Sequence, residues 1–87
     1  MKFEKNDLTI YEVEDIHKEL KQELSKGDIV IDLNNVNSLD MSVIQLFVST
    51  HKSCLAQNKN FTLSNNSQEV TDILKTASCE FLLGSAK

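Results

Sequence analysis

The sequence has no arginine, no proline and no tryptophan, and only two glycines, Gly27 and Gly84. All nine basic residues are lysines, and the net charge is −4. Proteins that read nucleic acid depend on a basic surface and on bidentate arginine, so nucleic-acid binding is disfavoured. Two isolated glycines cannot form a glycine-rich phosphate loop. No apolar run exceeds four residues, so we predict no signal peptide and no membrane insertion.

Cysteine is also scarce. Cys54 and Cys79 are the only two, 25 positions apart, and neither belongs to a CxxC pair or has a ligand-spaced histidine. We therefore expect two buried or idle thiols, with no disulfide, no metal site and no cofactor. Free thiols are typical of a reducing compartment, and we expect a cytoplasmic protein.

The length of 87 residues predicts one domain, residues 1–87, with a single core. Its clearest element is a helix from Tyr11 to about Ser25, which begins in an acidic turn and is stopped by Gly27. Apolar residues recur there at steps of three and four and define one buried face: Val13, Ile16, Leu20 and Leu24.

Strands and helices alternate in the rest of the chain. The apolar run Ile29–Leu33 predicts a strand covered on both faces, and Phe61–Leu63 predicts a second strand. One or two short strands are expected within 2–10, and residues 81–83 form either a last strand or a short helix. Asn66 or Ser67 caps a further helix whose apolar face is Val70, Ile73, Leu74 and Ala77. Such alternation favours an α/β sheet with parallel pairs.

The segment 28–45, DIVIDLNNVNSLDMSVIQ, leads from the apolar strand into another helix. We expect Ser42 to be its N-cap, in a capping box with Gln45, and the helix to reach about Gln57. Its predicted core stripe is Ile44, Phe47, Val48, His51 and Leu55. Leu46 then projects with Ser42, Ser49 and Ser53 on the opposite side, where small neighbours would let another surface approach.

Three stretches, in this order, resemble the STAS domain family (sulfate transporter and anti-sigma-factor antagonist). They are the strand and loop IVIDLNNVNSLD, the helix start Asp40-Met41-Ser42, and SQEVTDILKTAS at 67–78. The resemblance implies a single α/β domain, a four- to five-stranded mixed sheet with three or four helices. Met41 stands where the family often has Ser or Thr, and Val43 where it usually has Gly.

The resemblance also implies a function. It makes the chain similar to bacterial anti-sigma-factor antagonists, which are non-enzymatic signalling modules that bind a serine kinase or a related switch protein. Ser42 matches the family's phosphorylated serine, and Asp40 matches the aspartate that supports its phosphorylation. The partner-binding face is then expected at Ser42, Val43, Leu46 and Ser49.

Other interpretations stay open at this point. The chain also fits a small STAS subunit of a lipid-transport ATPase or a chemotaxis system, which docks through the same helix without phosphorylation. A serine hydrolase built on Ser42 is disfavoured because the glycines of GxSxG are absent. We expect His17 and His51 to pack at the core boundary. The loop asparagines either shape the loop or line a shallow polar site: Asn34, Asn35 and Asn37.

Overall fold

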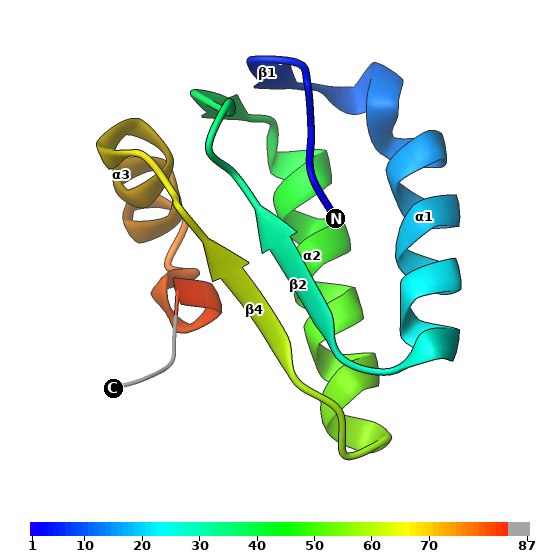
Figure 1. Cartoon of the computed structure of the whole chain (residues 1–87). Coiled ribbons are helices and arrows are strands. Elements are labelled where there is room, and N and C mark those ends of the chain that lie inside the picture. The colour runs from blue at the N-terminus through cyan, green and yellow to red at the C-terminus, as the bar shows by residue number, and fades with distance from the viewer. Residues whose placement is uncertain (84–87) are drawn as a thin grey trace.

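The computed structural model of the chain describes residues 1–83, which form nine short elements (Figure 1). In chain order these are β1 (Asp7–Leu8), the 3₁₀ helix η1 (Ile10–Glu12), α1 (Val13–Lys26), β2 (Ile29–Asp32), β3 (Ser38–Leu39), α2 (Met41–Ala56), β4 (Phe61–Ser64), α3 (Gln68–Thr76) and the 3₁₀ helix η2 (Glu80–Leu83). The predicted alternation of strands and helices is confirmed.

The sheet is smaller than the sequence led us to expect. Within residues 1–83 the strands form two parallel pairs, β1 with β3 and β2 with β4, instead of one mixed sheet of four or five strands. Two segments account for the difference. The amino-terminal residues run beside β2 but form only an isolated bridge, between Lys2 and Asp32, and no strand. Residues 81–83, which the sequence left open between a strand and a helix, belong to a 3₁₀ helix.

Helices α1, α2 and α3 lie along one face and the two edges of the β2–β4 pair (Figure 1). Helix α2 lies behind the two strands, α1 lies on the β2 side and α3 on the β4 side. The opposite face of the pair carries no helix within the described part of the chain. Val30 and Thr62 point to that face, and Val30 is 51% exposed. The expectation that this strand is covered on both faces is therefore wrong, because its side chains alternate between core and solvent.

The first and third helices agree with the sequence patterns. Ile16 and Leu20 are buried on α1 and Val13 and Leu24 are half-buried, while Gly27 ends the helix with φ 142°. On α3, Val70 and Leu74 are buried. Ser67 is confirmed as the cap of α3, since its hydroxyl accepts from the amide of Val70 at 3.2 Å.

Helix α2 has a different rotation from the one predicted. Its buried residues are Val43, Ile44, Phe47, Thr50 and Cys54. Leu55, which we placed in the core stripe, is 62% exposed. The stripe is shifted because α2 is covered by α1 on one side and by β4 and η2 on others, so the buried arc is wider than a single stripe.

Candidate docking site at the start of helix α2

The two short parallel strands β1 and β3 position the site. Leu8 pairs with Leu39, and the amide of Asp40 donates to the carbonyl of Leu8 at 2.9 Å. Because parallel strands end at the same edge, the helices that follow them, η1 and α2, begin side by side. Residues 8–12 and 39–43 are thereby brought together although 31 positions separate Leu8 from Leu39.

Helix α2 begins two residues earlier than predicted. Asp40, with extended φ −72° and ψ 155°, is its N-cap, and Met41 is its first residue. The amides of Val43 and Ile44 both donate to the carbonyl of Asp40, at 3.0 and 3.1 Å. Ser42 is therefore inside the first turn, and the predicted capping box with Gln45 does not form. The Asp40 side chain makes no capping bond to α2.

The carboxylate of Asp40 bonds a residue outside α2. Its Oδ2 accepts from the amide of Ile10 at 3.0 Å, at the first residue of η1. Asp40 therefore holds the start of one helix against the start of the other. The sequence placed Asp40 beside the phosphorylation site as its supporting residue; the structure shows a bond to Ile10 and no bond to Ser42.

A capping box that we did not predict lies at the amino-terminal end of η1. The side chain of Glu12 accepts from the amide and the hydroxyl of Thr9, both at 2.7 Å, and from Lys5 Nζ at 3.1 Å. These bonds, first the one from the Thr9 hydroxyl, lower the pKa of Glu12 to about 2. The pattern Thr-x-x-Glu at 9–12 is the sequence signal for such a box.

Ser42 is half-buried, and its Oγ is enclosed with no hydrogen-bond partner among residues 1–83. The next residue, Val43, is fully buried. The side chain of Val43 thus belongs to the core and is not at the surface, contrary to its expected place in the partner-binding face. A kinase or a partner that approaches this turn meets Met41 before it meets the Ser42 hydroxyl.

The expected docking face along α2 is also partly covered. Leu46 is half-buried and packs against the core, where it lines a small cleft between α2 and α1 with Ser49 and Leu20. Ser49 itself is exposed. The prediction that Leu46 projects freely beside Ser42 is wrong, because α1 packs along that side of α2.

The exposed apolar side chains at the site are ones that the sequence patterns did not single out. Tyr11 is 88% exposed, Ile10 61% and Met41 53%. We use the name α2-start surface for the exposed residues of the two helix starts that the Asp40–Ile10 bond joins: Ile10, Tyr11, Asp40 and Met41. Periodicity cannot identify such a surface, because it arises from the pairing of β1 with β3.

Met41 also borders an apolar groove of about 340 Å³ between α2 and α3. We call it the α2–α3 groove; its lining is Leu39, Met41, Ile44, Asp72, Ile73, Thr76 and Ala77. Within the described part of the chain, Asp72 is the single charged residue in that lining. The groove and the α2-start surface are continuous through Met41.

The remaining candidate residues have structural roles. Both cysteines are free and buried, as expected, and burial raises the pKa of the Cys54 thiol. His51 packs between the rings of Phe61 and Phe81, with centroids 5.9 and 5.6 Å away, in agreement with boundary packing. Asn35 bonds the carbonyl of Phe3, so the asparagine loop is tied to the amino-terminal segment.

Over residues 1–83, no three histidine, cysteine or acidic side chains are grouped so that they could hold a metal ion. In the same part of the chain, no helix has the length and apolar character needed to cross a membrane.

Comparison with known protein families shows which family the chain belongs to. A family model described as "Mlab, STAS domain" matches residues 5–84. Because the match covers nearly the whole chain, this protein belongs to the STAS domain family. Membership indicates a regulatory or binding module that contacts other proteins. A search of curated proteins found no match.

Proposed function

We propose that this protein is a non-enzymatic regulatory subunit that docks on a protein partner through the α2-start surface, without a phosphate on Ser42. The observation that carries the proposal is a contrast between neighbouring residues. The Ser42 hydroxyl is enclosed, while Met41 is 53% exposed, and Ile10 and Tyr11 of the adjoining helix η1 are 61% and 88% exposed. Exposed large apolar side chains that gather around one helix end are characteristic of protein interaction sites.

This corresponds to the second of the two binding roles that the resemblance implied, a small STAS subunit of a larger assembly such as a lipid-transport ATPase or a chemotaxis system. Met41 and Val43 favour it, since they replace the hydroxyl residue and the glycine usual in the family. Val43 is fully buried, so its side chain anchors the first turn of α2 in the core and holds Ser42 in place.

A switch by phosphorylation of Ser42, with a serine kinase of the anti-sigma-factor type as partner, is the second candidate. It is supported by the position of Ser42 in a first turn that the side chain of the N-cap residue, Asp40, does not cap. Free amides and the positive end of the helix would offset the charge of a phosphate there. This candidate requires the first turn to open, because the hydroxyl must reach the γ-phosphate of ATP.

The test begins with identification of the partner. A photo-reactive phenylalanine analogue at position 41 should crosslink one protein in the native host, and the same analogue at position 55 should not. The purified partner is then titrated calorimetrically with wild type, Met41→Glu and Leu55→Glu. Leu55 is the matched control because it is an equally exposed apolar residue at the other end of α2.

Burying an unpaired charge in an interface costs about 2–5 kcal/mol, so Met41→Glu should weaken binding at least about thirtyfold. A glutamate at the first helical position stabilises the helix by up to about 1 kcal/mol, so the loss would not come from unfolding. Leu55→Glu should bind like wild type. Normal binding by Met41→Glu would refute the docking surface.

The same partner distinguishes the two candidates. After incubation with the partner and ATP, mass spectrometry should find no phosphate on the protein, and Ser42→Ala should bind as wild type does. A phosphate on Ser42 that changes the affinity would select the switch instead.

A further inference from the structure

We infer that the α2–α3 groove receives a basic amphipathic helix of the partner, an inference that rests on the proposed function. The groove has apolar walls on two helices, with Met41 and Ile44 from α2 and Ile73 from α3. Its volume of about 340 Å³ lies at the small end of the range for ligand sites, roughly 300–1,000 Å³. A site of that size suits a few side chains of a partner and not a whole cofactor.

The shape of the groove favours a helix. The α3 wall is made of Asp72, Ile73, Thr76 and Ala77, which are spaced by one, three and one positions and so form one stripe along α3. Thr76 and Ala77 are small, and Thr76 is exposed, so another backbone can come close. A partner helix enters such a groove with apolar residues at positions i, i+3 or i+4, and i+7.

The charge around the groove indicates which kind of helix it would bind. Among residues 1–83, Asp72 is the only charged lining residue, and its Oδ1 accepts a bond from Gln68 at 2.9 Å, which holds the carboxylate on the outer surface of α3. Asp40, which precedes the lining residue Met41, adds a second carboxylate near the groove although it is bonded to the Ile10 amide, and the whole chain carries a net charge of −4. A lysine or arginine beside the apolar anchors of the partner is therefore attracted, whereas a fatty acid or an anionic lipid is repelled.

The experiment titrates the ¹⁵N-labelled full chain with two synthetic helical peptides. Both carry leucine at i, i+3, i+4 and i+7, and one has lysine where the other has glutamate on the flanking positions. The lysine peptide should shift the amide signals of the groove residues in a saturable way: Met41, Ile44, Ile73 and Ala77. It should bind about five- to tenfold more tightly than the glutamate peptide, the range expected for one accessible ion pair and its reversal.

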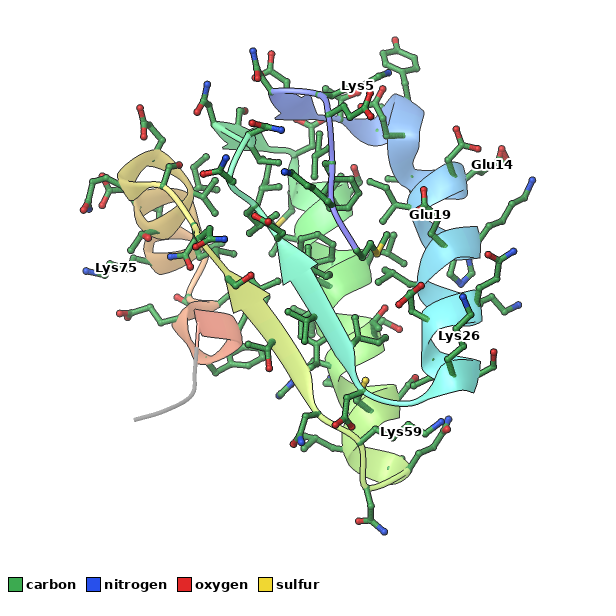
Figure 2. All side chains as sticks on the ribbon, viewed as in Figure 1. Lys5, Glu14, Glu19, Lys26, Lys59 and Lys75 are labelled. Atoms are coloured by element: carbon green, nitrogen blue, oxygen red, sulfur yellow. The ribbon has the colours of Figure 1, made fainter. Side chains whose placement is uncertain are left out.

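Two variants test the role of Asp72. Asp72→Lys should reverse the preference between the peptides, and Asp72→Asn should abolish it. Asp72 is exposed, so both variants should keep the fold. Glu19→Lys makes the same charge change on α1, on the side of the molecule away from α3 (Figure 2), and should leave the preference unchanged. A preference that Glu19→Lys alters as much as Asp72→Lys would overturn the inference.

Other occupants give other results. Signals that move with protein concentration alone would show a second copy in the groove, and tighter binding of dodecanoate than of the lysine peptide would show a lipid site; either result refutes the inference. If neither peptide moves the groove signals but Met41→Glu still abolishes partner binding, the inference fails and the proposed function stands. If Met41→Glu also binds the partner normally, both fail.

Discussion

Two leucines on the same helix test the rotation of α2. Leu46 is half-buried against α1 and the core, while Leu55 is 62% exposed. Replacing a fully buried leucine by alanine costs about 2–5 kcal/mol, so a half-buried one should cost roughly 1–2.5 kcal/mol. Leu55→Ala removes little buried surface and should cost less than about 0.5 kcal/mol. In a domain of this size 1 kcal/mol shifts Tm by about 4–8 °C, so the two variants should melt at clearly different temperatures.

The assay is urea unfolding followed by far-UV circular dichroism, with the two variants and wild type compared at a common slope. Each change removes the same atoms from the same helix, so differences in helix propensity cancel. The periodicity of the sequence gives the opposite expectation, with Leu55 in the core and Leu46 at the surface. A larger loss for Leu55→Ala than for Leu46→Ala would show that the helix is rotated as the periodicity suggests and would remove the structural basis of the docking site.

Two further predictions concern the ends of α1. Gly27→Ala should destabilise the protein by about 1–3 kcal/mol. The cause is backbone strain at φ 142° and not a steric clash, because nothing lies within 4 Å of the added Cβ. Gln22→Ala, on the exposed side of the helix, is the control and should be nearly neutral in the same unfolding assay. The pKa of Glu12 is about 2 in the folded protein against 4.5 ordinarily, so the unfolded chain binds more protons between these values and stability falls as the pH falls through that window. Glu12→Gln keeps an oxygen that can accept from Thr9 but cannot titrate. Unfolding curves from pH 5 to pH 2 should therefore show a smaller loss of unfolding free energy for the variant than for wild type. Equal losses would contradict the capping box.

Elements with an unambiguous start, period and stop were predictable from the sequence. Helix α1 has apolar residues on one face only and a glycine at its end, and helix α3 has a serine cap followed by the same pattern. In both cases one set of residues satisfies the local preferences and the tertiary packing at once. The β2 and β4 strands were found for a related reason, because short apolar runs between polar turns have few alternatives.

Helix α2 was less predictable because it is apolar on several sides. Its first half contains Val43, Ile44, Leu46, Phe47 and Val48, which cover so much of the helix circumference that the narrow polar side does not fix the rotation. The packing of α1 on one side and of β4 and η2 on others determines which of them are buried. That information lies in segments far away in the chain, and periodicity within the helix does not contain it.

The extent of the sheet was overestimated for a similar reason. Apolar content showed that the segments near residues 2–10 and 81–83 would contact the core, and Phe3, Leu8 and Leu82 are indeed buried. Burial alone does not require a strand, since a side chain can be buried from an irregular segment or from a 3₁₀ turn. Whether such a segment pairs depends on long-range backbone hydrogen bonds, which a single sequence does not reveal.

The candidate site was more sensitive to these errors than the fold. Asp40 and Ser42 are both good N-cap residues, two positions apart, and local preference does not choose between them. The choice is made by the bond from the Asp40 amide to Leu8, which keeps residue 40 extended beside β1. Because the helix starts after Asp40, Met41 and Ser42 both lie in its first turn, where the helical backbone fixes the direction of each side chain. That start places Met41 at the surface and encloses the Ser42 hydroxyl. The residue that a partner meets at this helix is therefore determined by a backbone bond between two short strands, and a prediction of the site requires that bond as well as the motif.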